Sequence, residues 1–571
     1  MTHEALPDAV RLEGAGKRAL EVGRTRLVIG ATLFALGFLG LGLRLVEVSV
    51  LGGGDDAGRS GASSAAGAQR ADIVDRNGVV LATNVESHAL YADARLVRDA
   101  PALARRLAEI LPDLDPEQAA RGLASGRSFV WIRRQLSPRQ VYAVNRLGEP
   151  GLRFLPAQRR VYPLGPLVSH VLGYVDVDNR GLGGIERRFD RELQADPAAP
   201  LALSLDIRFQ HVLRAELAAA LAEFKAIGAA GVILDIASGE VLAMVSLPDF
   251  DPNRPATDAG GDDARFNRAA LGRYEMGSTF KTFTAAMALD SGTVALTDGF
   301  DASQPLHIAR FTIRDFHPEG RWLSVPEIFM YSSNIGAARM ALAVGAERQR
   351  DYLGRFGLLA PSPVELPEVG EPITPDVWRE VTTATIGFGH GIAISPLQLA
   401  TAVASLVNGG TAVTPTVLLR RGAPAAGAQV VSPRTSHQMR QLLRLAVKLG
   451  TGKRAEVEGY LVGGKTGTAE KSDKRGYDRR RLISSFVGAF PIDRPRYVVF
   501  AVLDEPKGTE RTLGYATGGW TAAPLVARVV ARIAPLAGIA PRSAPLPGED
   551  GSDGKPLLVT PDGTEIRLAS F

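Results

Sequence analysis

The stretch YEMGSTFKTFTAAMALDSG, residues 274–292, forms the centre of the fold. It reads as an apolar helix in which Phe283 and Met287 recur at helical spacing, and yet Lys281 lies near its start. Residues three apart share one face of a helix, so Ser278 and Lys281 should lie together. Burial and a nearby cation both disfavour the protonated form of a lysine. The stretch therefore predicts a serine whose hydroxyl loses its proton to a neutral lysine.

Composition restricts the class of protein. The chain has 571 residues, of which 45% are hydrophobic and 22% charged, as in ordinary globular proteins. Its net charge of +5 is small for that length and no long basic run is present, which argues against nucleic-acid binding. The absence of cysteine excludes disulfides, thiolate metal sites and thiol catalysis. The eight histidines lack metal-ligand spacing, so we expect neither a metal nor another cofactor.

An apolar segment near the N-terminus indicates the location of the protein. Residues 27–43 carry no charge, and with Arg44 reaching the interface they predict a transmembrane anchor over 27–46. Basic residues precede the segment, so we expect a cytoplasmic tail at 1–26. The prediction is a single-pass protein of the inner (cytoplasmic) membrane, with its catalytic domain on the periplasmic, or extracytoplasmic, side. A cleaved signal peptide is the alternative, but its candidate site at 66–68 lies too far beyond the apolar segment.

Pattern and composition divide the rest of the chain into four parts. Residues 47–69 are small and polar and are predicted to be a linker. Residues 70–200 mix short strands and helices, beginning with a hairpin signal at Asn77-Gly78, and should form a non-catalytic pedestal domain. Residues 201–540 should form the catalytic domain, and the Pro/Gly-rich residues 541–571 a flexible tail.

The catalytic domain has strand patterns at both ends and helices between them. Asp206 is predicted to cap a helix that ends at Gly228, and two strands should flank the Ser238-Gly239 turn. Residues 280–450 are mostly helical in pattern. A single antiparallel sheet built from both ends, with a helical insert, is the economical solution and gives an α+β fold. The returning strands are predicted in YLVGGKTGTAE, RLISSFVGAF and RYVVFAVLDEP.

A second motif lies in YSSNIGAARMAL. By itself, Ser332-Ser333-Asn334 is a helix cap. In the company of Lys281, Ser332 can relay a proton to a leaving group, and the Asn334 amide can hold a substrate carbonyl. Both interpretations stay open from these residues alone.

A third motif lies in the strand pattern GGKTGTAE. Gly467 leaves room for a peptide along the strand edge. Lys465 and the hydroxyls of Thr466 and Thr468 are predicted to bind a carboxylate. The backbone N–H of Thr468, with that of Ser278, is predicted to form an oxyanion hole.

The three motifs in the order S-x-x-K, S-x-N, K-T-G resemble those of class A β-lactamases and penicillin-binding proteins. The surrounding segments ADIVDRNGVVLATN, IGFGHGIAISPLQLATAVASLVNGG and GYLVGGKTGTAEK extend the resemblance to penicillin-binding proteins over most of the chain. With one anchor and no recognisable glycosyltransferase domain, the chain is identified as a member of class B. The sequences FGHG and GYATGGWTAAP resemble the division-type branch more than the elongation-type one. A run at 448–451 lacks the hydroxyl of the third motif and is set aside.

The resemblance implies a fold and a reaction. The fold is the penicillin-binding transpeptidase fold, with helices flanking an antiparallel sheet, a helical subdomain, and a pedestal of the dimerisation type. The reaction is that of a peptidoglycan D,D-transpeptidase in septal cell-wall synthesis, acylated at Ser278 by a stem peptide ending in D-Ala-D-Ala. An amine of a neighbouring strand then takes the acyl group, and β-lactams trap the same serine. Implied partners are a polytopic membrane glycosyltransferase and division proteins.

Four alternatives were weighed against this interpretation. A class A β-lactamase needs a glutamate-activated water, and no E-x-x-L-N sequence lies between Asn334 and Lys465. A β-lactam sensor needs a signalling output, which residues 1–26 do not offer. A catalytically silent division scaffold has no need to retain the residues of the three motifs. An elongation-type class B transpeptidase is the alternative within the family.

Overall fold

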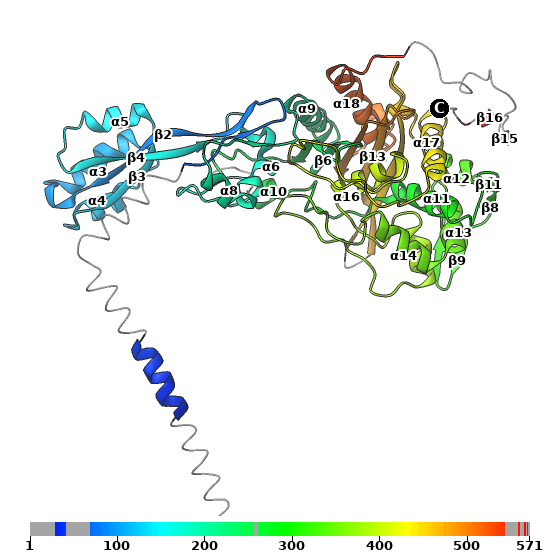
Figure 1. Ribbon diagram of the computed structural model, residues 1–571, viewed down its shortest axis with the longest axis horizontal. Helices are drawn as coiled ribbons and strands as arrows, with labels where there is room; N and C mark the ends of the chain where they lie inside the picture. Colours follow the sequence, from blue (N-terminus) through cyan, green and yellow to red (C-terminus); the bar gives the residue numbers. More distant parts are fainter. Residues whose placement is uncertain are drawn as a thin grey trace, which may run out of the picture. The chain divides into compact units, whose positions relative to one another are not determined.

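The structure, a computed structural model, forms two compact units (Figure 1). The first unit takes in Met1–Ala68 and Glu86–Gln158, and the second Gln69–Val85 and Arg159–Phe571. The described residues are 29–40, 69–255, 261–473, 476–542, 558–559, 565–566 and 568.

The predicted anchor is described only over residues 29–40, which form a solvent-exposed helix. In these described ranges, no helix has the length and hydropathy that crossing a membrane requires. The cytoplasmic tail predicted at 1–26 lies outside the described residues, as do nearly all of the linker at 47–69 and of the tail at 541–571. The anchor and its topology therefore stay predictions.

In the first unit, helices pack against strands of a mixed sheet, in which β2 (Val80–Ala92) pairs with β3 (Val130–Leu136) and with β4 (Leu152–Val161). The pairing of β2 with β3 is antiparallel. Each helix begins at a side-chain cap followed by proline in its first turn, the combination that best satisfies the free N–H groups of a helix start. The core between strands and helices is made of leucine, alanine and valine. The helices are α3 (Ala100–Ile110), α4 (Pro116–Leu123) and α5 (Pro138–Asn145).

The second unit is built on a five-stranded antiparallel sheet with the strand order β12-β13-β14-β6-β7. Two of its strands come from the start of the predicted catalytic domain and three from its end, which confirms the predicted sheet. The strands are β6 (Gly228–Asp235), β7 (Val241–Leu247), β12 (Gly463–Asp473), β13 (Gly476–Phe490) and β14 (Tyr497–Asp504).

Both faces of this sheet are covered by helices. In β14, alternate residues enter two different cores, so the strand is a continuous apolar run. One core contains α9 (Ile207–Glu223) and α18 (Ala522–Leu536). The other contains α11 (Lys281–Asp290) and α16 (Pro396–Val407). The first turn of α11 is therefore held firmly between the sheet and the rest of the helical insert.

The helix α9 ends earlier than predicted. Asp206 caps it as expected, with its carboxylate accepting the N–H of Arg208. The helix stops at Glu223 and not at Gly228, because Lys225 adopts the left-handed conformation with φ 47°. Gly228 instead opens β6.

The helical insert lies to one side of the sheet (Figure 1). Two short antiparallel strand pairs, β8 with β11 and β9 with β10, accompany its helices. The helices are α12 (Val325–Tyr331), α13 (Asn334–Val344), α14 (Ala346–Arg355), α15 (Glu380–Ile386) and α17 (Pro433–Lys448). The short strands are β8 (Gly299–Asp301), β9 (Leu306–Ile308), β10 (Phe311–Ile313) and β11 (Trp322–Ser324).

The start of the second unit carries the predicted hairpin and a buried ionic cluster. β1 (Ile73–Val74) pairs with β2 across Asn77-Gly78, which confirms the hairpin. Arg70 precedes β1 by a few residues. Its guanidinium donates to the Glu186 carboxylate at 2.8 Å, and Arg160 donates to the same carboxylate at 2.7 Å. None of these three side chains is exposed to solvent. We call them the arginine–glutamate cluster.

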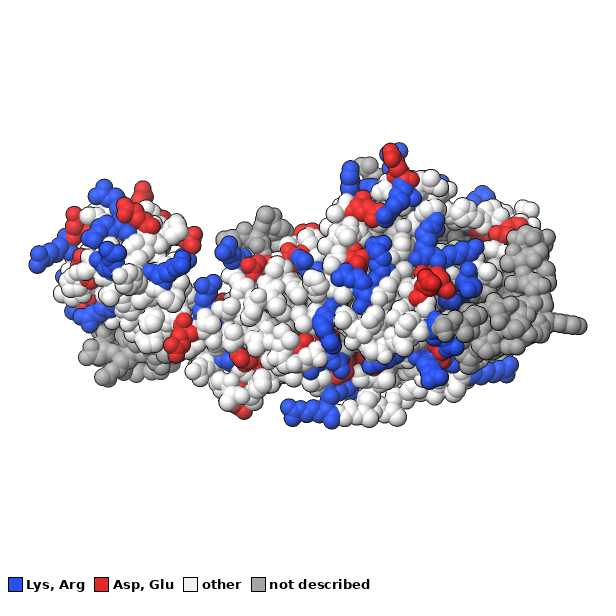
Figure 2. Space-filling view, turned by 90° about the horizontal axis from the view of Figure 1, so that it is seen from above, with Lys and Arg blue, Asp and Glu red and all other residues white. Residues whose placement is uncertain are grey.

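Charges of both signs are interspersed over the surface. Figure 2 shows Lys and Arg among Asp and Glu on the face in view, without a broad area of one sign. The small net positive charge is therefore spread out on this face and not gathered into a basic patch.

Candidate active site

Ser278 and Lys281 lie side by side at the start of α11. Ser278 belongs to η4 (Gly277–Phe280), a single 3₁₀ turn that leads into the helix. The α-helix itself begins only at Lys281, but a 3₁₀ turn brings residues three apart even closer into line. Lys281 Nζ lies 3.0 Å from Ser278 Oγ, so the predicted approach of the two groups is present.

Lys281 is surrounded by neutral oxygen atoms. Its side chain is buried, and Nζ lies 2.8 Å from Asn334 Oδ1 and 3.1 Å from Ser332 Oγ, and also contacts the Ser332 carbonyl. Burial is the main cause that holds the pKa of Lys281 well below its usual value, and the charge of Lys465 lowers it further. Lys281 can therefore be neutral at a pH where a surface lysine is charged.

Ser332 connects the two lysines of the site. It ends α12 in the left-handed conformation, with φ 61°, which directs both its carbonyl and its hydroxyl to Lys281. Such a conformation costs a residue other than glycine about 1–3 kcal/mol and persists only where the surroundings impose it. Lys465 Nζ donates to Ser332 Oγ at 2.9 Å. The Ser332 hydroxyl thus lies between Lys281 and Lys465.

Asp315 supports this arrangement and was missed by the sequence analysis. Its carboxylate accepts hydrogen bonds from the Ser333 hydroxyl and from the backbone N–H groups of Asn334 and Ile335. These bonds fix the first turn of α13 and therefore the amide of Asn334. Asp315 follows a short strand and belongs to no motif, so no pattern in the sequence marks it.

The third motif lies on β12, the edge strand of the sheet. Lys465 is fully buried, and burial lowers its pKa to about 7. Successive side chains of a strand point to opposite faces, so the side chains of Thr466 and Thr468 lie on one face of β12 and the side chain of Lys465 lies on the other. Thr466 Oγ1 lies 2.8 Å from the hydroxyl of Thr451, in the run that the sequence analysis set aside, and Thr468 Oγ1 accepts the Gly518 N–H at 3.0 Å.

Two glycines let η4 lie directly against β12. Because η4 carries the candidate nucleophile Ser278, we call it the nucleophile turn. A Cβ added to Gly277 would lie 2.4 Å from the carbonyl oxygen of Thr468, and one added to Gly467 would lie 2.6 Å from that of Met276. Both glycines are needed for this contact, and Gly277 also has φ +52°. The predicted role of Gly467, leaving room for a substrate, stays a proposal.

A second group of polar residues borders the nucleophile turn. The Glu275 carboxylate accepts the N–H of Gly391 and the hydroxyl of Tyr477. The rings of His390 and Tyr477 lie 5.2 Å apart. We call Glu275, His390 and Tyr477 the Glu275 corner. Across the described ranges, no group of three or more His, Asp or Glu side chains is placed to hold a metal ion.

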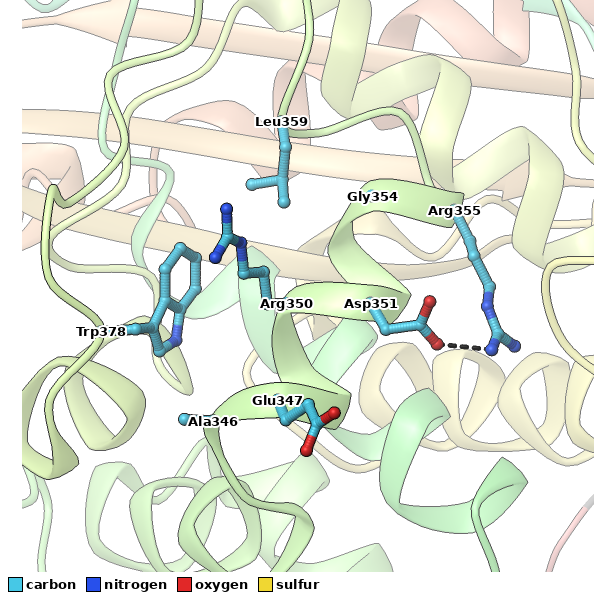
Figure 3. Close-up of a pocket in the computed structure, with 8 residues that line it drawn as sticks. All are labelled: Ala346, Glu347, Arg350, Asp351, Gly354, Arg355, Leu359 and Trp378. Atoms are coloured by element: carbon cyan, nitrogen blue, oxygen red, sulfur yellow. Dashed lines mark ion pairs between the residues drawn. The ribbon is translucent and has the colours of Figure 1, made fainter.

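A separate hollow of about 570 Å³ lies along α14 (Figure 3). Arg350 and Trp378 line it together, and Asp351 and Arg355 form an ion pair at its rim. Its lining contains neither a hydroxyl nor a lysine, so it offers no counterpart to the Ser278–Lys281 pair.

A serine beside a buried lysine, at the edge of an antiparallel sheet enclosed by helices, is the arrangement of the active-site serine enzymes that carry S-x-x-K. The family description "Penicillin binding protein transpeptidase domain" matches residues 229–531, and "Penicillin-binding Protein dimerisation domain" matches residues 65–198. The chain belongs to the penicillin-binding proteins, in class B and in its division-type branch.

Relatives and solved structures agree with this family. The chain is 41% identical to the "Probable peptidoglycan D,D-transpeptidase FtsI" of Caulobacter vibrioides, over 94% of this chain and 92% of the relative. It is 29% identical to the "Peptidoglycan D,D-transpeptidase FtsI" of Escherichia coli, over 89% of this chain and 90% of that one. The crystal structure of penicillin binding protein 3 from Mycobacterium tuberculosis with ampicillin covers 84% of this chain and 98% of its own, at 25% identity and a TM-score of 0.67. The fold predicted for the catalytic and pedestal parts is thereby confirmed.

Proposed function

We propose that the protein is the peptidoglycan D,D-transpeptidase of septal cell-wall synthesis and that it works through an acyl-enzyme on Ser278. The observation that carries the proposal is the approach of Lys281 Nζ to Ser278 Oγ at 3.0 Å, at a place where burial and the charge of Lys465 favour the unprotonated amine. The names of the two FtsI relatives support the same activity.

In the acylation step, Lys281 takes the proton of the Ser278 hydroxyl as Oγ attacks the carbonyl carbon between the two terminal D-alanines. The peptide C–N bond then breaks and an ester to Ser278 forms. The leaving D-alanine must receive a proton on its nitrogen. Ser332 supports this transfer, because its hydroxyl lies 3.1 Å from Lys281 Nζ and can pass a proton outward.

The substrate is held by the strand edge. The backbone N–H groups of Ser278 and Thr468 stabilise the oxyanion, and the contact between the nucleophile turn and β12 brings the two residues together. The hydroxyls of Thr466 and Thr468 bind the terminal carboxylate, and Gly467 keeps the strand edge open. The positive charge of Lys465, which donates to the Ser332 hydroxyl, attracts the same carboxylate from the other face of the strand. Asn334 binds a substrate carbonyl through the amide that also orients Lys281.

In the second step, an amine of a neighbouring strand attacks the ester, forms the cross-link and returns a proton to Ser278 Oγ. β-Lactams acylate the same serine and leave it blocked. The apolar residues 27–46 anchor the chain in the inner membrane, with the catalytic part outside the cytoplasm. A polytopic glycosyltransferase that polymerises the glycan, together with division proteins, is the matching partner in the membrane.

Intact-mass spectrometry of the full chain in detergent tests the proposal. Incubation with benzylpenicillin should add one penicilloyl mass to the wild-type protein and none to Ser278→Ala. Thr279→Ala is the matched control, because it removes the neighbouring hydroxyl, which donates to Met276 inside the turn, and should still be acylated. A penicilloyl adduct on Ser278→Ala would overturn the assignment of the nucleophile.

A further inference from the structure

Two buried polar atoms beside the nucleophile turn have no hydrogen-bond partner among the described residues. They are Oε2 of Glu275 and Nε2 of His390. A buried polar atom left unpaired costs about 1–3 kcal/mol, and such atoms are uncommon in folded proteins. Their presence within one small group of residues suggests that something outside the chain completes them.

The two carboxylate oxygens of Glu275 differ in their hydrogen bonds. Oε1 accepts the backbone N–H of Gly391 at 2.8 Å and the Tyr477 hydroxyl at 3.1 Å. Oε2 is buried and accepts no hydrogen bond from the described residues. Burial accordingly raises the pKa of Glu275 above its usual value, against the two hydrogen bonds, which lower it. The carboxylate is therefore oriented by the protein through one oxygen, while the other is left without a hydrogen-bond partner among the described residues.

The Glu275 corner belongs to the active site. Glu275 precedes Ser278 by three residues, and two of the three chain segments that form the corner are joined by backbone hydrogen bonds between Tyr274 and Ile394. The Gly277 N–H donates to the Gly389 carbonyl at 3.2 Å, which places His390 directly beside the nucleophile turn. Burial is the main cause that lowers the pKa of His390 to about 4. His390 is thus neutral and does not compete for the carboxylate.

The shape and charge of the corner suit a flexible amine. The rings of Phe388 and Tyr477 each lie 5.2 Å from that of His390, so three aromatic rings are clustered at the corner. An ammonium group has three N–H donors, and a carboxylate oxygen without a partner is its preferred acceptor. Stem peptides carry a free amino group, since the cross-link is made from one.

We propose that Glu275, His390 and Tyr477 form a subsite for the free side-chain amine of a stem peptide, with Glu275 Oε2 accepting its N–H. The inference rests on the proposed transpeptidase function and adds to it the group that is recognised beyond the terminal D-alanines. The amine belongs either to the donor peptide that acylates Ser278 or to the acceptor peptide that releases it. The chemistry of recognition is the same for both.

The experiment uses the full chain in detergent and has two arms. In the donor arm, the second-order acylation constant is measured for a lysyl-D-alanyl thioester with a free ε-amine and for the same compound with that amine acetylated. In the acceptor arm, a thioester without an amine acylates the enzyme, and product analysis gives the ratio of aminolysis by Nα-acetyl-lysine to hydrolysis. Wild type and Glu275→Gln are compared in both arms.

We expect Glu275→Gln to lose about tenfold or more in one of the two ratios, the size of a charged hydrogen bond. A loss of preference for the free amine in the first arm identifies the donor, and a loss of aminolysis in the second identifies the acceptor. If both ratios stay within twofold of wild type, the subsite does not exist. If the wild type itself is not acylated by any thioester or by benzylpenicillin, the proposed function has failed and the subsite falls with it.

Glu368→Gln is the matched control. Burial raises the pKa of this carboxylate as well, and it too accepts a backbone N–H, but both of its oxygens are paired with Gly184. It should leave both ratios unchanged, and a loss equal to that of Glu275→Gln would overturn the inference. Should Glu275→Gln not fold, as judged by its melting curve, Glu275→Asp withdraws the charge by one methylene and must show the same loss.

Discussion

The second unit buries charged side chains in two places and treats them in opposite ways. In the arginine–glutamate cluster, Arg70 and Arg160 both donate to the carboxylate of Glu186, and no side chain of the three is exposed. At the active site, Lys281 and Lys465 are buried equally well, but their hydrogen-bond acceptors within the described residues are hydroxyl, carbonyl and amide oxygens.

The difference lies in whether a counter-ion was buried with the charge. A carboxylate between two guanidinium groups is buried together with opposite charges, and removing one partner leaves an uncompensated charge in the interior. The two active-site lysines have no carboxylate among their hydrogen-bond partners within the described residues, so burial disfavours their protonated forms, and for Lys281 the charge of Lys465 adds to this effect. The same burial thus gives a fixed structural charge in one place and a base that can exchange a proton in the other.

Replacing Lys281 by methionine should produce the largest effect and should separate chemistry from stability. Acylation by benzylpenicillin should slow by about 10²- to 10⁴-fold, the contribution of a general base. The variant should be more stable than wild type at pH 7, because unfolding lets the native lysine bind a proton that its lowered pKa refuses in the fold.

The pH dependence of this gain has a definite sign. The loss of unfolding free energy that the neutral Lys281 causes is present below the pKa of lysine in the unfolded chain. It disappears as the pH rises through that value, near 10.4. Urea unfolding at pH 7 and at pH 10 should therefore show a difference between Lys281→Met and wild type that narrows at the higher pH. A variant that is less stable than wild type at pH 7 would mean that Lys281 is charged in the fold.

Replacing Glu186 by glutamine tests the other side of the comparison. It should lower the free energy of unfolding by about 3–5 kcal/mol, since the buried Arg160 loses its carboxylate partner and the buried Arg70 keeps only Asp190, at 2.6 Å. Glu216 is the matched control: it also accepts two arginines, Arg528 and Arg532, but at the surface, where their side chains are 40% and 42% exposed. Glu216→Gln should cost about 1 kcal/mol or less. Equal losses in the two variants, measured by urea unfolding, would show that the cluster is not held by its charge.

The lysine pair was open to prediction because each lysine lies in a short motif. The approach of Ser278 and Lys281 follows from a spacing of three residues, whereas the burial of Lys465 was not predicted, since its strand GGKTGTAEKSD is not an apolar run. The sheet was predictable, since β6, β7 and β14 are apolar runs long enough to be recognised singly. The sequence placed Ser332 with Lys281 as a candidate proton relay, but its contact with Lys465 as well was not predicted.

The remainder depends on contacts that no local pattern carries. Arg70 and Glu186 are 116 residues apart, and neither is a residue type expected in a core. The support that Asp315 gives to α13 and the contact of Thr451 with Thr466 join loops to elements in the same way. The early end of α9 at a left-handed Lys225 is an error of another kind, because lysine at that position gives no sign of such a conformation.

The smallest predicted effect concerns the coupling between the two lysines. The second-order acylation constant reports the free enzyme, so it should rise with pH as Lys281 loses its proton and fall again above about 7 as Lys465 loses the charge that assists carboxylate binding. Lys465→Met removes the positive charge that lowers the pKa of Lys281. In this variant, the rising limb should move to higher pH and the falling limb near 7 should vanish. Lost binding alone would scale the whole curve down without moving it, so a rising limb at the wild-type position would show that the lysines are not coupled.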